Sequence, residues 1–201
     1  MINFTIFLVD ENTAVLKALR RLLQTAGYET KEYCSAEMFL SEHDASIPGC
    51  ILMDSVMPGL NGLDVQEILN RKGIDRPIIF LTGKATIPDS VQAMKAGAVD
   101  FLTKPVDRSK LLNAIKSAEE RDTTQRHITE RRNGVLEKIA KLTRREREVL
   151  ALVVAGELNK NIGVRLGIHI NTVKVFRGRV FKKLEAKTLA ELVRMTVGMP
   201  I

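Results

Sequence analysis

The segment CILMDSVMPGLNG, residues 50–62, is the most informative part of the sequence about the fold. It opens with an apolar run of strand length, Cys50–Met53, which leads directly into Asp54. Other runs of strand length recur in the first half of the chain: Ile6–Val9, Ile78–Leu81, Val99–Leu102 and the weaker, alternating Tyr28–Tyr33. Short apolar runs of this kind are typical of strands that are buried on both faces of a parallel sheet.

Amphipathic segments of helical period separate the predicted strands. They cover about residues 14–26, 36–42, 63–70, 87–96 and 109–118. Gly27, Gly73 and Gly97 follow three of them, at positions where a left-handed helix cap favours glycine. Five strands that alternate with five helices predict an α/β domain with a doubly wound parallel sheet, in which ligands bind at the carboxyl ends of the strands.

Polar residues stand at those carboxyl ends. Asp10 and Glu11 follow the first predicted strand, and Asp54 follows the third. Thr82 and Lys104 follow the fourth and the fifth. Three carboxylates placed close together require a cation, and a hard ion such as Mg²⁺ suits oxygen ligands. Beside such an ion Asp54 is a candidate nucleophile toward phosphorus, with Thr82 and Lys104 as partners of the phosphoryl oxygens.

The segments around these residues resemble the signatures of the two-component receiver domain. They read FLVDENTAV, ILMDSVMPGLNG, FLTGKA and AGAVDFLTKPVD, and the resemblance covers about the first 120 residues. It implies that Asp54 is the phosphoacceptor. It also implies that Mg²⁺ is bound by Asp10, Glu11, Asp54 and the backbone carbonyl of Val56. Glu11 departs from the family pattern, which more often has Asp at this position.

The same resemblance implies a conformational switch. Thr82 and Phe101 would form the switch pair, because they match the family's positions at the ends of the fourth and fifth strands. Lys104 would contact the phosphoryl group and be followed by a cis peptide bond to Pro105.

An enzymatic interpretation of these residues is a phosphatase of the haloacid dehalogenase type, which also uses a strand-end Asp with Mg²⁺. Such enzymes need a second Asp two residues later as general acid, and Val56 stands there instead. The receiver resemblance implies a phosphoacceptor that is no enzyme beyond self-phosphorylation from small donors and autodephosphorylation. The resemblance also implies that Val56 and Lys84 lie near the path of the attacking water. We expect autodephosphorylation to be slow, because neither Val56 nor a protonated Lys84 can accept a proton from water.

Charge divides the chain into two parts. Residues 1–124 hold 14 basic and 17 acidic residues, a net charge of −3, whereas residues 125–201 hold 17 and 7, a net charge of +10. A basic C-terminal block favours nucleic acid or anionic lipid as a partner. No apolar run approaches the roughly 18 residues of a membrane span, and the N-terminus lacks the basic region of a signal peptide. Cys34 and Cys50 fit two free thiols in a reducing cytoplasm.

The basic part predicts short helices after a linker. Residues 121–141 are mostly charged or polar and predict a partly helical linker with a break near Asn133 and Gly134. Thr143 and Glu146 form a capping box that begins the next helix. Further helices are predicted at about residues 160–166, 171–184 and 189–197. The short turn between the first two of these is consistent with helix-turn-helix, and the basic face of the longer one is typical of a recognition helix.

Residues 142–197 resemble the LuxR-type helix-turn-helix domain, through LTRREREVLALVVAGELNKNIGVRLGIHINTVKVFRGRVFKKL. Together with the receiver signatures, this resembles the FixJ/NarL class of response regulators and leans toward its FixJ and StyR branch. The resemblance implies that Lys174 and Val175 reach base edges. The other implied DNA contacts, mainly to phosphate, are Thr172, Arg177, Arg179 and Lys183. His169, Phe176 and Gly178 depart from the family pattern.

The sequence thus predicts a receiver at residues 1–120, a linker at 121–141 and a four-helix LuxR-type domain at 142–201. We expect a cytoplasmic response regulator whose Asp54 is phosphorylated by a partner histidine kinase. The phosphorylated homodimer would then bind double-stranded DNA at a two-half-site operator and regulate transcription, with RNA polymerase as a candidate further partner. The alternatives are a regulator of the same architecture that works without phosphorylation, and RNA binding by the basic part.

Overall fold

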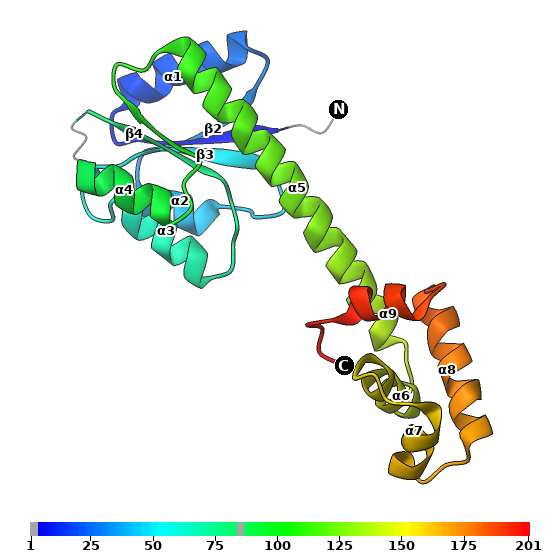
Figure 1. The fold of residues 1–201 in the computed structure, drawn as a ribbon. Helices are drawn as coiled ribbons and strands as arrows, with labels where there is room; N and C mark the ends of the chain where they lie inside the picture. Colours follow the sequence, from blue (N-terminus) through cyan, green and yellow to red (C-terminus); the bar gives the residue numbers. More distant parts are fainter. Residues whose placement is uncertain (1–3, 84–86) are drawn as a thin grey trace. The chain divides into compact units, whose positions relative to one another are not determined.

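A computed structural model describes residues 4–83 and 87–201 of the chain. In the first compact unit, residues 1–126, five parallel strands form one sheet in the order β2-β1-β3-β4-β5 (Figure 1). The strands are β1 Thr5–Val9, β2 Glu29–Tyr33, β3 Gly49–Asp54, β4 Ile78–Thr82 and β5 Asp100–Thr103. The helices that follow them in turn are α1 Thr13–Thr25, α2 Ala36–Glu42, α3 Gly62–Arg71, α4 Ile87–Lys95 and α5 Arg108–Ala140. This confirms the predicted doubly wound α/β fold.

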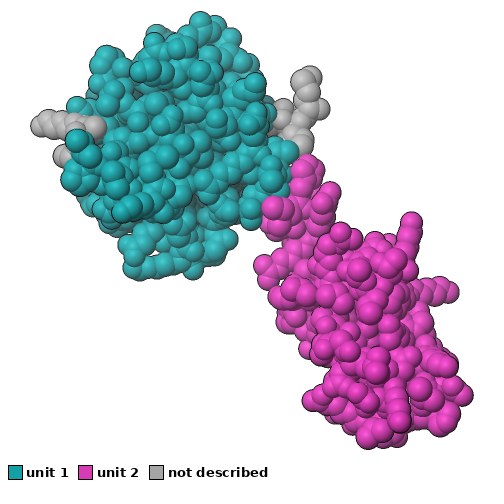
Figure 2. Space-filling model, in the orientation of Figure 1, with its two compact units in different colours: residues 1–126 teal, residues 127–201 magenta. Residues whose placement is uncertain are grey.

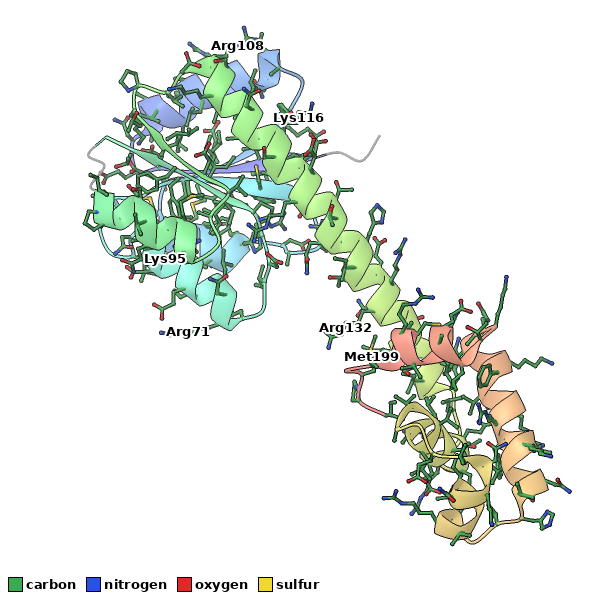
Figure 3. The ribbon with its side chains drawn as sticks, viewed as in Figure 1. Arg71, Lys95, Arg108, Lys116, Arg132 and Met199 are labelled. Atoms are coloured by element: carbon green, nitrogen blue, oxygen red, sulfur yellow. The ribbon has the colours of Figure 1, made fainter. Side chains whose placement is uncertain are left out.

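Helices cover both faces of the sheet, because successive side chains of a strand point to opposite sides. On β1, Ile6 and Leu8 pack against α1 and α5, whereas Phe7 and Val9 pack against α2, α3 and α4. The side chains of β3 and β4 divide in the same way between the two core clusters. Charged side chains lie on the outer surfaces of the helices, among them Arg71, Lys95, Arg108 and Lys116 (Figure 3). Two polar residues, Asp10 and Thr82, are buried at the carboxyl ends of β1 and β4.

Helix α5 extends well beyond the predicted end of the receiver. Near its middle, Arg126 Nε lies 2.8 Å from Asp122 Oδ2, and the Arg126 guanidinium also donates to the carbonyl oxygens of residues 45, 46 and 47. Asp122 Oδ2 in turn accepts a hydrogen bond from the backbone N–H of Gly49 at 3.2 Å. These contacts explain why the first compact unit continues to residue 126.

The expected helix break near Asn133 and Gly134 is wrong. Helix α5 runs through both residues without interruption to Ala140. One glycine in an exposed helix costs only about 1 kcal/mol relative to alanine, which good helix formers on either side can offset. The predicted domain boundaries at residues 120 and 141 stay predictions.

The second compact unit covers residues 127–201 (Figure 2), and its core is formed by helices. It contains the end of α5 and the helices α6 Arg144–Val154, α7 Asn159–Leu166, α8 Ile170–Leu184 and α9 Leu189–Thr196. Its core is aliphatic and includes Ile139 of α5, Val149 of α6, Ile162 of α7, Val173 of α8 and Leu192 of α9. Among the helices in the described ranges, none is long and apolar enough to cross a membrane.

Candidate functional site

The carboxyl edge of the sheet brings three of the predicted side chains into direct contact. Lys104 Nζ, just after β5, lies 2.6 Å from Asp10 Oδ2 and 2.6 Å from Asp54 Oδ2. Asp10 is buried and its other oxygen accepts the backbone N–H of Asn12 at 2.8 Å. The backbone N–H of Val56 donates to Asp54 Oδ1 at 3.1 Å. Two acids from separate strands are therefore held around one ammonium group.

This arrangement keeps Lys104 charged. Burial by itself would lower the pKa of Lys104, but hydrogen bonds from the ammonium to Asp10 and Asp54, together with their charges, outweigh burial and raise that pKa. A cation fixed between two carboxylates at a strand edge is well placed to meet an anionic group that arrives at either acid.

Glu11 does not join this cluster in the same way. Its side chain is exposed, whereas Asp10 is buried and Asp54 is half-buried. Within residues 4–83 and 87–201, no three His, Cys, Asp or Glu side chains come close enough together to form a metal site by themselves. The oxygen donors of Asp10 and Asp54 nevertheless suit a hard divalent cation, with Glu11 and the carbonyl of Val56 next to them in sequence.

The predicted switch residues flank the acidic edge. Thr82 ends β4 with its side chain fully buried, and its carbonyl oxygen accepts the backbone N–H of Lys104 at 2.7 Å. Phe101 on β5 is half-buried with its ring 5.9 Å from that of Phe80. The peptide bond between Lys104 and Pro105 is cis, as the family resemblance implied.

Of the two residues linked above to autodephosphorylation, Val56 and Lys84, the structure describes only Val56. Val56 is 62% exposed beside the acidic site. Lys84 lies outside the described residues, so its part of that expectation stays a prediction.

A tight loop between β3 and α3 supports Asp54, and sequence reasoning missed two of its supports. The backbone N–H of Gly62 donates to the carbonyl oxygen of Ser55 at 3.2 Å and closes the loop at its base. Glu37 Oε1, from α2, accepts the backbone N–H of Leu60 at 3.2 Å. Nothing in the sequence indicated the contact from Glu37, because this residue lies 23 positions before Leu60 along the chain.

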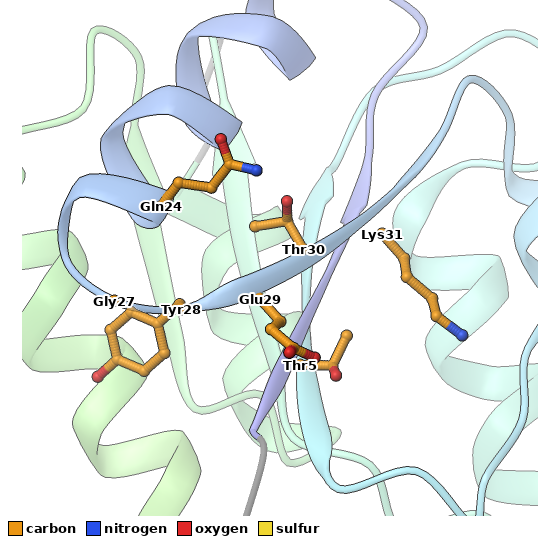
Figure 4. Close-up of a pocket in the computed structure, with 7 residues that line it drawn as sticks. All are labelled: Thr5, Gln24, Gly27, Tyr28, Glu29, Thr30 and Lys31. Carbon is orange, nitrogen blue, oxygen red and sulfur yellow. The ribbon is translucent and has the colours of Figure 1, made fainter.

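A separate hollow of about 440 Å³ lies at the opposite edge of the sheet (Figure 4). Thr5, at the start of β1, and Glu29, at the start of β2, are among the residues that line it. Since Asp10 and Asp54 follow the other ends of their strands, this hollow does not belong to the acidic site.

In the second unit, α7 and α8 form the predicted helix-turn-helix. Gly167 ends α7 in the left-handed region, with φ of 64°, and His169 caps α8 by accepting the backbone N–H of Asn171 on its Nδ1 at 3.3 Å. A Cβ on Gly163 would lie 2.8 Å from the carbonyl oxygen of Ile168, so glycine allows the turn to pack closely on α7. His169, which departs from the family pattern, thus still serves as the N-cap of α8.

Helix α8 separates packing residues from candidate contacts to DNA. Val173, Val180 and Leu184 are buried in the core. Five of the predicted contact residues are exposed, namely Thr172, Lys174, Val175, Arg179 and Lys183. Arg177 is half-buried, and its Nη1 donates to Asn159 Oδ1 of α7 at 2.8 Å.

Lys183 has a structural partner that the sequence did not reveal. Its Nζ lies 2.6 Å from Glu146 Oε2, and the Glu146 side chain is only 3% exposed. Glu146 also accepts the backbone N–H of Thr143 at 2.8 Å, as the predicted capping box requires. Lys183 therefore ties α8 to the start of α6, and its contact with DNA stays a prediction.

From the pair of Lys183 and Glu146 we expect the second unit to become less stable to unfolding at low pH. Burial works to raise the pKa of Glu146, but hydrogen bonds from Lys183 and Thr143 outweigh it and hold that pKa below its usual range. A lowered pKa in the folded state means that the stabilisation is present above the unfolded pKa of about 4.3 and is lost as pH falls through the folded value. We expect Glu146→Gln to cost about 2 kcal/mol of unfolding free energy at neutral pH.

The difference between parent and Glu146→Gln in urea unfolding, followed by circular dichroism, should shrink as the pH falls below about 5. Glu148→Gln is the matched control, because Glu148 pairs with Arg144 and Arg145 at the surface, where such pairs contribute little. A difference that stays constant with pH would show that the charge of Glu146 does not contribute to stability.

Comparisons with known proteins agree with this geometry. The family described as the response regulator receiver domain matches residues 6–116, and the luxR family of bacterial regulatory proteins matches residues 129–196. Response regulator protein TodT of Pseudomonas putida is 40% identical over 95% of this chain and 84% of its own length. Transcriptional regulatory protein FixJ of Azorhizobium caulinodans is 39% identical over 97% of this chain and 92% of its own length.

A solved structure extends the likeness to three dimensions. The response regulator StyR superposes with a TM-score of 0.81 at 37% sequence identity, over 97% of this chain and 98% of its own. The chain therefore belongs to the two-component response regulators of transcription that join a receiver domain to a LuxR-type helix-turn-helix DNA-binding domain.

Proposed function

We propose that Asp54 accepts a phosphoryl group from a partner histidine kinase and that this modification controls binding of the second unit to DNA. The observation that carries the proposal is the position of Lys104, whose ammonium lies 2.6 Å from both Asp10 and Asp54. Transfer of a phosphoryl group requires an acceptor acid beside a fixed cation, because negative charge builds up on the oxygens of the phosphoryl group.

In the proposed transfer, a carboxylate oxygen of Asp54 attacks phosphorus while the bond to the donor nitrogen of histidine breaks. The electron pair of that bond stays on the imidazole nitrogen, and Asp54 becomes an acyl phosphate. Lys104 exchanges its contact with Asp54 Oδ2 for a phosphoryl oxygen, and it stays anchored by Asp10. The hydroxyl of Thr82 is the candidate donor to a second phosphoryl oxygen.

Mg²⁺ would be held by Asp10, Asp54 and the carbonyl of Val56, with Glu11 as the fourth candidate. When bound, it neutralises charge on the phosphoryl oxygens. Asp10 then has two tasks, since it also pairs with Lys104. Because Asp10 is buried and bonded to the backbone N–H of Asn12, its carboxylate is held in one orientation for both tasks.

The proposed route from Asp54 to dimerisation passes through Thr82 and Phe101 to α4. Ile87, Val91 and Met94 lie on one face of α4 and are 81%, 45% and 46% exposed. Such a stripe of apolar side chains is the candidate contact between two phosphorylated copies. A dimer in turn would present two recognition helices to a two-half-site operator.

Acetyl phosphate tests this sequence of events. With donor and Mg²⁺ present, we expect sedimentation velocity to show a dimer and duplex DNA carrying the operator to bind more tightly than before labelling. If Asp54 is labelled but DNA affinity and mass do not change, the chain works without phosphorylation. We place these events in the cytoplasm, where the kinase, the DNA and RNA polymerase as a candidate partner are available.

Substitutions on α8 separate the proposed contacts with bases from those with phosphate. Each phosphate contact steepens the salt dependence of DNA affinity by about 0.9 in slope. We expect Arg177→Ala to weaken binding to all sequences and flatten the slope. Lys174→Ala should weaken the operator more than random DNA, because a base contact carries sequence information. Equal losses on both DNAs in both variants would contradict this division.

A further inference from the structure

We propose that Asn159 is a positioning residue that holds Arg177 ready for a DNA phosphate. The inference rests on the proposed phosphate contact of Arg177. The two residues come from different helices of the helix-turn-helix, since Asn159 is the first residue of α7 and Arg177 lies in the middle of α8. Arg177 Nη1 donates to Asn159 Oδ1 at 2.8 Å, and both side chains are partly buried.

A second contact restrains the same guanidinium. The Cζ atom of Arg177 lies 5.9 Å from the ring centroid of Phe181, one helical turn further along α8. Arg177 thus has one partner on α7, Asn159, and one on its own helix, Phe181. An arginine that is already ordered loses less side-chain entropy when it binds a phosphate than a freely rotating one does.

The hydrogen bond to Asn159 leaves Arg177 able to bind DNA. A guanidinium has five N–H donors, and Asn159 accepts from only one amino group. The partner is also neutral, so it orients the arginine without cancelling its charge. Lys183 differs in this respect, because its partner Glu146 is a carboxylate, which neutralises the charge of the lysine.

The neutrality of Asn159 makes the inference testable. The slope of log affinity against log salt counts the cations that replace counterions on DNA. An asparagine carries no charge, so its loss cannot change that slope directly, even if its amide touches DNA. A change in slope on removal of Asn159 must therefore act through a cation, and Arg177 is the one it contacts.

The experiment measures the salt slope of the full-length protein on a short duplex of random sequence. We expect Asn159→Ala to flatten the slope by up to about 0.9 per bound domain, as Arg177→Ala does, and the double variant to match Arg177→Ala alone. Asn159→Ser is a second variant that still favours the start of a helix but cannot reach Arg177. Asn161→Ala is the matched control, since it removes an exposed amide from the same helix, and it should keep the parental slope.

Three results would overturn the inference. A parental slope in both variants of Asn159, whatever their affinity, would give the residue a purely structural role. Further flattening when Asn159→Ala is added to Arg177→Ala would show that Asn159 acts on a different cation. A parental slope in Arg177→Ala would instead overturn the proposed phosphate contact itself, and the positioning of that contact with it. Thermal unfolding of each variant confirms that the measured protein is folded.

Discussion

Asp54→Asn is expected to abolish Mg²⁺-dependent labelling by radioactive acetyl phosphate. Asparagine has nearly the same shape as aspartate, but its amide cannot form an acyl phosphate. The variant should still fold, because one amide oxygen can replace one of the two acceptor oxygens of Asp54, and Lys104 keeps its contact with Asp10. The loss of labelling is therefore a loss of chemistry and not of structure.

Asp75→Asn is the matched control for this prediction. Asp75 is an exposed acid that pairs with Arg121 at 3.3 Å and takes no part in the acidic edge. We expect it to be labelled like the parent. Undiminished labelling of Asp54→Asn would show that the acceptor is another residue.

Gly62→Ala should impair both stability and phosphorylation. A Cβ at this position would lie 2.7 Å from the ring of Phe80, 2.8 Å from the carbonyl oxygen of Asp54 and 3.1 Å from Cα of Ser55. Two of these neighbours are backbone, which cannot move aside as the end of a flexible side chain can. We expect a loss of about 1–3 kcal/mol in unfolding free energy and slower labelling, because relief of the overlap displaces Asp54 from Lys104.

Gly134→Ala provides the contrast. Nothing lies within 4 Å of a Cβ at Gly134, which stands inside helix α5. Alanine there should stabilise the helix by about 1 kcal/mol and leave labelling unchanged. Urea unfolding and the initial rate of labelling measure both variants. Parental stability and rate in Gly62→Ala would mean that the loop after Asp54 adapts without moving the acid.

The acidic site could largely be predicted from the sequence, because its residues stand at the ends of strands. Asp10, Asp54 and Lys104 were predicted to meet because parallel strands end at one edge, and the structure brings them together. The same reasoning placed Glu11 with them, but the structure leaves its side chain exposed. The place of a residue along its strand decides at which edge of the sheet it lies, as for Asp10. The direction of a side chain after the strand has ended, as for Glu11, depends on the conformation of the turn that follows.

Three features could be predicted from the amino-acid sequence: the alternation of strands and helices, the strand ends that hold the acids, and the capping box at Thr143 and Glu146. Each of these depends on residues that are close along the chain, where period, propensity and caps act directly. Three contacts became visible only in the folded chain: Arg126 holds α5 to the loop before β3, Lys183 pairs with Glu146, and Asn159 contacts Arg177. A charged side chain in a sequence has many candidate partners, and only the packing of distant helices selects the one it meets.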